Sequence, residues 1–191
     1  MKVSIGISAR HVHLCSSDFE KLFGTDYKLT KLVDINQPGQ YACVEKVNLI
    51  TEKSRIDNVR IIGPLRNYTQ VEISKTDSYL LGLNPPIRES GDLKGAENIM
   101  IEYNGRVINV NECCIISDRH IHATYEDLEK YNLKNNQIVK LKINSEKGAI
   151  LENVRIKASD ASYFEAHLDL DDANANLIKN GDLGEIIYEW I

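Results

Sequence analysis

The 191-residue chain has no long hydrophobic run, no cluster of basic residues and no export signal. A membrane-spanning helix needs roughly 18 consecutive apolar residues, and no stretch approaches that length. The apolar stretch before Arg10 is too short to predict a signal peptide. The net charge is −5 without a Lys/Arg-rich segment, whereas nucleic-acid-binding proteins normally carry a basic patch. We therefore expect no membrane partner and no nucleic-acid partner.

Cysteine is also scarce, with four residues in the chain. Cys113 and Cys114 are adjacent, so they match neither a CxxC zinc knuckle nor a CxxC redox motif. Without an export signal we expect a reducing, cytoplasmic environment, in which disulfides are rare. We interpret Cys113 and Cys114 as buried structural thiols on a strand. The 42% hydrophobic and 27% charged residues are typical of an ordinary globular protein.

The sequence contains an internal repeat. Residues 7–13 (Ile-Ser-Ala-Arg-His-Val-His) recur at 116–122 (Ile-Ser-Asp-Arg-His-Ile-His), and Asn-Val-Arg-Ile occurs both at 58–61 and at 153–156. The two Asn-Val-Arg-Ile copies lie closer together in the sequence than the two copies of the first motif. Extra chain in the first half, around the Pro-Gly turn at 37–40, accounts for the difference. The offset of the second pair places Glu72 opposite His167. The two halves are therefore variants of one structural unit.

Within each half, short alternating or β-branched runs bounded by turn residues predict strands. These runs are Val44–Ile50, Val59–Ile62, Tyr68–Ile73, Ile138–Ile143 and Ile150–Ile156. We expect capping boxes to begin helices at Ser17-x-x-Glu20 and Thr124-x-x-Asp127, and closing helices over roughly 77–81 and 172–179, ended by Gly82 and Gly181. Asn104-Gly105 predicts a hairpin. The predicted fold is mainly β, with two small β-barrels each capped by short α-helices.

All histidines of the chain occupy positions that the repeat relates to one another or to Glu72. They are His11, His13, His120, His122 and His167. In each His-x-His pair the two imidazoles share one face of a strand. Glu72 in the first half and His167 in the second stand where a neighbouring strand would add a third ligand. Three ligands with an open position are typical of catalytic zinc.

The alternative is that these histidines are surface or core residues satisfied by hydrogen bonds. The recurrence of the pair, with no histidine elsewhere, favours metal binding. Because one set contains Glu72 where the other contains His167, we expect the two metal sites to differ by one unit of charge.

Three arginines lie near these motifs. Arg10 and Arg119 precede the His-x-His pairs and suit either an anionic ligand or a structural brace. Arg66 follows a Gly-Pro turn, six residues before Glu72, and its counterpart in the second half is Ala161. Because the repeat does not demand an arginine there, Arg66 is a candidate substrate contact, although a surface arginine on a loop remains the alternative.

Several long motifs, in order along essentially the whole chain, resemble the PduL-type phosphotransacylases, which are phosphate propanoyltransferases. The motifs are Ser-x-Arg-His-Val-His-Leu (8–14), Gln-Pro-Gly-Gln (37–40), Gly-Pro-Leu-Arg-x-Tyr-Thr-Gln-Val-Glu (63–72), Arg-Glu-Ser-Gly-Asp (88–92), Arg-His-Ile-His (119–122) and His-x-Asp-x-Asp-Asp-Ala-Asn-Ala (167–175). The resemblance implies a transferase of bacterial propanediol degradation. Such an enzyme exchanges coenzyme A and phosphate on a propanoyl or acetyl group: acyl-CoA plus phosphate gives acyl phosphate plus CoA.

The resemblance also implies where the site residues lie. In the family, two zinc ions lie between two β-barrel domains, here residues 1–9 plus 118–191 and residues 10–117. One zinc would take His11, His13 and Glu72, and the other His120, His122 and His167. Arg66 would be the catalytic, phosphate-binding arginine. Contacts to CoA would fall on Ile7, Ser8, Ala9, Lys53, Arg60 and Asn174.

We expect phosphate to attack the thioester directly, because the histidines are assigned to metal and no Ser-His-Asp or Cys-His set is evident. The alternatives are a zinc hydrolase of a thioester or acyl phosphate, and a metal-storage or structural module. Structural zinc usually has four protein ligands, which argues against the latter.

Family members in bacterial microcompartments carry a targeting helix before the first strand, whereas here Val3 already begins that strand. We therefore expect a cytoplasmic enzyme rather than a microcompartment one, and a homodimer. Cys15 departs from the Ser or Thr helix cap usual in the family.

Overall fold

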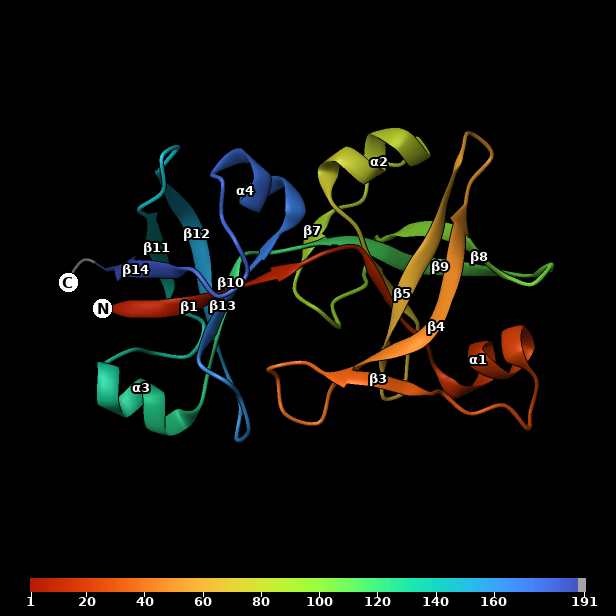
Figure 1. Ribbon diagram of the computed structural model, residues 1–191, viewed down its shortest axis with the longest axis horizontal. Coiled ribbons are helices and arrows are strands. Elements are labelled where there is room, and N and C mark those ends of the chain that lie inside the picture. The colour runs from red at the N-terminus through yellow and green to blue at the C-terminus, as the bar shows by residue number, and fades with distance from the viewer. Residues whose placement is uncertain (189–191) are drawn as a thin grey trace. The chain divides into compact units, whose positions relative to one another are not determined.

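The computed structural model describes residues 1–188, which form a mainly β protein with four short helices (Figure 1). The chain divides into two compact units. One unit is Arg10–Ser117, and the other combines Met1–Ala9 with the chain from Asp118 onward. Each unit contains a closed ring of six strands, so the predicted pair of β-barrels is confirmed. No helix among the described residues has the length and apolar character needed to cross a membrane.

The unit Arg10–Ser117 builds its barrel from strands paired in the cyclic order β4–β5–β2–β6–β9–β8. Strands β3 and β7 extend this sheet by pairing with β4 and β9. The elements are β2 (His11–His13), α1 (Ser16–Phe23), β3 (Lys31–Asp34), β4 (Tyr41–Ile50), β5 (Arg55–Gly63), β6 (Gln70–Glu72), α2 (Lys75–Leu81), β7 (Ile87–Arg88), β8 (Glu97–Tyr103) and β9 (Arg106–Ser117).

The second unit closes its barrel in the order β1–β13–β10–β12–β11–β14. Its elements are β1 (Lys2–Ser8), β10 (His120–Ala123), α3 (Tyr125–Tyr131), β11 (Ile138–Ile143), β12 (Ala149–Ala158), β13 (Glu165–Asp169), α4 (Leu170–Ala175) and β14 (Leu183–Ile187). The histidine strand β10 pairs parallel with β12 and antiparallel with β13, as β2 pairs with β5 and β6. The internal repeat is therefore a repeat of strand pairing.

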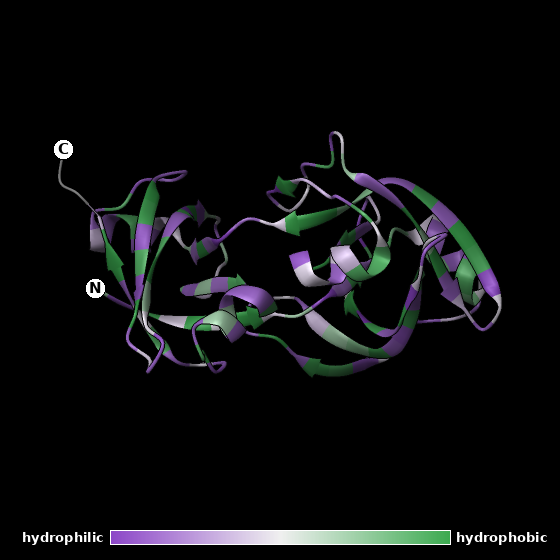
Figure 2. Ribbon diagram, turned by 90° about the horizontal axis from the view of Figure 1, so that it is seen from above, coloured by the Kyte–Doolittle hydropathy of each residue, from purple (hydrophilic) through white to green (hydrophobic). Residues whose placement is uncertain are grey.

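Each barrel encloses its own hydrophobic core, because successive side chains of a strand point to opposite faces. In β4 the buried positions alternate at Cys43, Glu45, Val47 and Leu49. Figure 2 shows apolar and polar residues in bands along the strands. Cys43, Cys113 and Cys114 are buried free thiols, so the structural interpretation of the adjacent pair is confirmed. Burial raises the pKa of Cys43 to about 11 and that of Cys113 to about 12.

Two helices differ from the expected boundaries. The predicted capping box at Ser17 is wrong: the N-cap of α1 is Cys15, two residues earlier, and the Cys15 side chain makes no capping hydrogen bond. Helix α4 is shorter than predicted: it covers Leu170–Ala175, with Asp169 as N-cap and Asn176 as C-cap, and ends well before Gly181. Carboxylate and hydroxyl oxygens accept from the first backbone N–H groups, and the Sγ of Cys15 instead contacts the Ser17 hydroxyl.

The remaining turn and cap predictions hold. Thr124 and Asp127 form a capping box at α3, and Gly82 ends α2 in the left-handed conformation. Helix α2 begins at its own capping box, Ser74 with Asp77, two residues before the expected start. The two-residue turn Asn104-Gly105 joins β8 to β9 with positive φ at both residues, as a type I′ hairpin requires.

Arg10 and Arg119 act as structural braces. Arg10 bonds the buried carboxylate of Asp77 through both Nε and Nη2, at 3.0 and 2.8 Å. Arg119 bonds Asp172 in the same way at 2.7 Å through each nitrogen. Each arginine therefore ties the strand that carries a His-x-His pair to the first turn of a helix, α2 or α4, within its own unit.

Candidate functional site

Each barrel contains one set of three side chains whose ligand atoms all lie within 4.8 Å of one another. In the unit Arg10–Ser117 the first set is His11, His13 and Glu72. In the other unit the second set is His120, His122 and His167. The strand register produces both sets, because His11 faces Glu72 across the β2–β6 pair and His120 faces His167 across β10–β13. The predicted third ligand thus lies beside the histidine pair in both halves.

In the first set the histidines are oriented by their surroundings. The Nδ1–H of His13 donates to the carbonyl oxygen of Ile62 at 3.0 Å, which leaves the lone pair on Nε2 for a metal. Burial, His11 and the positive charge of Arg66 together hold the pKa of His13 well below its ordinary value of 6.5. His13 is therefore neutral near neutral pH, as a metal ligand must be. The Nε2 of His11 lies 3.6 Å from Oε1 of Glu72.

In the second set two ring nitrogens converge on one point. The Nδ1–H of His120 donates to the carbonyl oxygen of Asp118 at 2.9 Å, and its Nε2 lies 3.2 Å from Nε2 of His122. Two nitrogens bound to one tetrahedral zinc at about 2.0–2.1 Å are separated by about 3.3 Å. The observed separation therefore fits two ligands of one ion.

The donor types in both sets also fit zinc. Imidazole nitrogen and carboxylate oxygen are its common protein ligands, and three protein ligands leave a position open for a substrate. The carboxylate of Asp118 supports the second set: burial would raise its pKa, but hydrogen bonds with His120 and Arg155 lower it overall. A charged, oriented partner of this kind fixes the ring and tautomer of a ligating histidine.

Arg66 lies in the same unit as the first set and is connected to it by hydrogen bonds. Its Nη1 donates to Oγ of Ser90 at 3.1 Å, and Nε2 of Gln70 donates to the same oxygen at 2.9 Å. Gln70 also donates to Oε1 of the ligand Glu72 at 2.6 Å. The second terminal nitrogen of Arg66 lies 3.5 Å from Oε1 of Gln40. The guanidinium is therefore held beside the first set and is not a free surface group.

The residues that the resemblance associates with CoA are spread over both units. Ile7, Ser8 and Ala9 lie at and just after the end of β1, and Asn174 is exposed on α4. Arg60 faces His11 in the β2–β5 register and donates to the carbonyl oxygens of Cys43 and Val44.

Lys53 lies apart from the first ligand set. It precedes β5, whose strand needs roughly 17 Å to run from Arg55 to Arg60. Its Nζ donates to the carbonyl oxygen of Tyr79 on α2 at 2.9 Å. Arg60 therefore lies beside the first set, whereas Lys53 does not.

Three polar residues in contact with these groups were missed by the sequence reasoning: Ser90, Gln70 and Glu165. Gln70 donates to Glu72, and Glu165 accepts from Nε2 of His167 at 2.9 Å. A usable signal existed, because Gln70 and Glu165 each stand two residues before a third ligand and therefore share its strand face. Ser90 lies within the Arg-Glu-Ser-Gly-Asp motif, but its contact with Arg66 depends on the fold.

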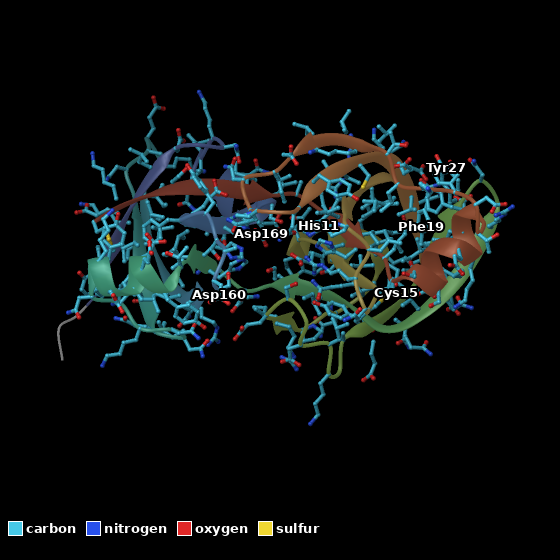
Figure 3. The ribbon with its side chains drawn as sticks, turned by 90° about the horizontal axis from the view of Figure 1, so that it is seen from below. His11, Cys15, Phe19, Tyr27, Asp160 and Asp169 are labelled. Carbon is cyan, nitrogen blue, oxygen red and sulfur yellow. The ribbon has the colours of Figure 1, made fainter. Side chains whose placement is uncertain are left out.

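His11 and Asp169, on β2 and at the end of β13, can be located in Figure 3.

Comparison with known proteins identifies the chain's relatives. A family model described as phosphate propanoyltransferase matches residues 4–179. Among curated proteins, the phosphate propanoyltransferase of Priestia megaterium is 46% identical over 98% of this chain and 87% of its own length. The enzymes of that name from Clostridioides difficile and Thermotoga maritima are 43% and 42% identical, each over 97% of this chain and over 88% and 89% of their own lengths. The chain therefore belongs to the phosphate propanoyltransferase family of acyltransferases.

Proposed function

We propose that this enzyme exchanges CoA and inorganic phosphate on a short acyl group, propanoyl or acetyl, and holds one zinc ion in each ligand set. The observation that carries the proposal is the hydrogen-bonded path from a three-ligand set, through Gln70 and Ser90, to the guanidinium of Arg66. An arginine fork beside an open metal position suits a reaction in which an inorganic anion is a substrate. The names of the relatives, phosphate propanoyltransferase, supply the acyl group and the acceptor.

The first zinc would be held by His11, His13 and Glu72, and the second by His120, His122 and His167. When bound, zinc supplies Lewis-acid polarisation of the thioester carbonyl and stabilises negative charge on the departing sulfur. The chain's own contribution is to keep the imidazoles neutral and oriented. Burial and the contact with Ile62 do this for His13, and the contact with Asp118 does it for His120.

Arg66 has the role of binding phosphate. Its planar guanidinium donates two parallel hydrogen bonds, which hold a phosphate dianion and direct one of its oxygens at the thioester carbon. Ser90 and Gln40 hold the arginine in place before substrate binds. The phosphate oxygen forms a bond to the acyl carbon, the carbon–sulfur bond breaks, and its electron pair leaves on the CoA sulfur, which takes up a proton from solvent.

An acyl-enzyme intermediate is not part of the proposal. All five histidines belong to the ligand sets, so none remains to activate a serine or cysteine as a nucleophile. The buried thiols are also unsuited to this role, because burial raises their pKa values and keeps them protonated. For CoA we retain Ile7, Ser8, Ala9, Arg60 and Asn174 as proposed contacts. Lys53 is retained as a proposed contact as well, at a place apart from the first ligand set.

An initial-rate assay of CoA release from propanoyl-CoA tests the proposal against the hydrolase alternative. Release should require inorganic phosphate, and arsenate should substitute for it by giving an acyl arsenate that hydrolyses. Release at the full rate without either anion would identify a hydrolase and overturn the proposal. Acyl phosphate formed in the reaction should be trapped by hydroxylamine in an amount equal to the CoA released.

A further inference from the structure

The two ligand sets are supported by residues at equivalent positions, of which one is a neutral amide and the other a carboxylate. On β6, Gln70 stands two residues before the ligand Glu72, and on β13, Glu165 stands two residues before the ligand His167. The amide of Gln70 donates to Oε1 of Glu72 at 2.6 Å. In the second set the direction is reversed, since a carboxylate only accepts: Nε2–H of His167 donates to Oε2 of Glu165 at 2.9 Å.

We infer that Glu165 is a positioning residue of the second metal site, and that it supplies there the carboxylate that Glu72 supplies in the first. The inference rests on the proposed function only in that both sets bind zinc. Each pair, Gln70 with Glu72 and Glu165 with His167, contains one carboxylate and one neutral partner. The carboxylate has exchanged places between the ligand position and the supporting position. The two pairs of ligand and supporting residue therefore carry equal formal charge, whereas Glu72 and His167 alone differ by one unit.

The second barrel is built to hold this carboxylate. Glu165 is 3% exposed, and a buried carboxylate is costly unless partner groups or a cation offset its desolvation. Strand β1 passes beside the pair, with Gly6 facing His167 in register. A Cβ at Gly6 would lie 2.8 Å from Oε2 of Glu165 and 3.1 Å from the His167 ring. Glycine at this position therefore leaves the space that Glu165 and His167 occupy.

A carboxylate that accepts from the second nitrogen of a ligating histidine performs a recognised task in metal sites. It fixes the tautomer and the orientation of the ring and makes the metal-binding nitrogen more basic, and its loss typically lowers metal affinity by about 10–100-fold. The other carboxylate near this set, Asp118, does not alter the balance of charge, because Nε of Arg155 pairs with it at 3.1 Å. Glu165 is thus the carboxylate of the second set that corresponds to Glu72 of the first.

The test is a zinc titration of metal-free protein against a chromophoric chelator, with four variants. Glu165→Gln keeps the size and an accepting oxygen but removes the charge, and should lower zinc affinity at one of the two sites by about tenfold or more. The double variant Glu165→Gln/His167→Glu installs the pair of the first set and should recover most of that loss. In the other barrel, Gln70→Glu places two carboxylates side by side and should impair the other site. Gln70→Glu/Glu72→His should restore it.

Glu45→Gln is the matched control, because Glu45 is equally buried but bonds the backbone N–H of Thr30, away from the metal ligands. It should lower the melting temperature and leave both zinc affinities unchanged. Cobalt substituted for zinc gives a second readout, since its visible absorption should change in Glu165→Gln and return toward the original in the double variant.

Two results would overturn the inference: wild-type zinc affinity in Glu165→Gln, or a loss that the double variant does not recover. If the Glu165 variants do not fold, the Gln70 and Glu72 pair in the other barrel decides by the same criterion. The proposed function fails separately, if wild-type protein binds fewer than two zinc ions or releases CoA without phosphate.

Discussion

Replacing Arg66 by alanine should reduce kcat/KM for phosphate by about a hundredfold while leaving the fold and both metals in place. The guanidinium is the positive group bonded, through Ser90 and Gln70, to the first ligand set. Losing one preorganised donor to charge that develops in a transition state costs roughly 3 kcal/mol, and each 1.36 kcal/mol is about a factor of ten in rate. The structural loss is smaller, about 1 kcal/mol for the 3.1 Å hydrogen bond to Ser90. Steady-state kinetics with varied phosphate, zinc content and the melting temperature should be measured together.

Two further variants separate fork geometry from charge. Arg66→Lys should recover only part of the lost rate, because an ammonium group restores the charge but not the two parallel donors. Arg55→Ala removes an exposed arginine of the same barrel, paired with Asp57, and should leave the kinetics unchanged. Near-normal phosphate kinetics in Arg66→Ala would refute the reasoning. So would unfolding or zinc loss in that variant, because either would make the arginine a structural residue.

The remaining predictions concern metal, pH, thiols and the brace. Elemental analysis of protein purified without chelator should give two zinc ions per chain; one or none would contradict the two-site proposal. Because the pKa of His13 is lowered, the unfolded chain binds a proton below pH 6.5 that the folded chain does not. Metal-free protein should therefore lose stability as pH falls below that value. A melting temperature that stays constant between pH 7.5 and 5.5 would argue against this effect of His13. In the native protein, a thiol reagent should modify Cys15 alone, with the other three cysteines reacting only after denaturation. Asp77→Ala breaks the ion pair with Arg10 and the α2 capping box, and should lower the free energy of unfolding by about 2–4 kcal/mol. A change below about 0.5 kcal/mol would show that the ion pair and the cap contribute little to stability.

Much of the candidate site follows from the sequence, because strand periodicity depends only on local geometry. Two histidines separated by one residue must share a strand face, wherever that strand lies. The internal repeat then pointed to Glu72 and His167 as third ligands, since equivalent positions in two copies of a unit occupy equivalent places. The register of β2 with β6 and of β10 with β13 places both residues beside their histidine pairs.

The start of a helix depends on more than local sequence where several side chains compete for the same backbone groups. The N-cap of helix α1 is Cys15 instead of the better capping residue Ser17, because the chain leaving β2 is held by tertiary contacts. The backbone N–H of Cys15 donates to the hydroxyl of Thr69, and the backbone N–H of Arg66 donates to the carbonyl of Leu14. Contacts from distant parts of the chain therefore outweighed the cap preference.

The sequence predicts the repeated barrel unit, the grouping of Glu72 and His167 with the histidine pairs, and an arginine at position 66 that the repeat does not require. These features depend on periodicity and on comparison of the chain with itself. The hydrogen bonds of Ser90 with Arg66, of Gln70 with Glu72 and of Glu165 with His167 could not be predicted in this way and depend on the folded chain. A hydrogen bond depends on distance and direction to within a few tenths of an ångström, and those quantities are set only when strands pair in one register and the barrel closes.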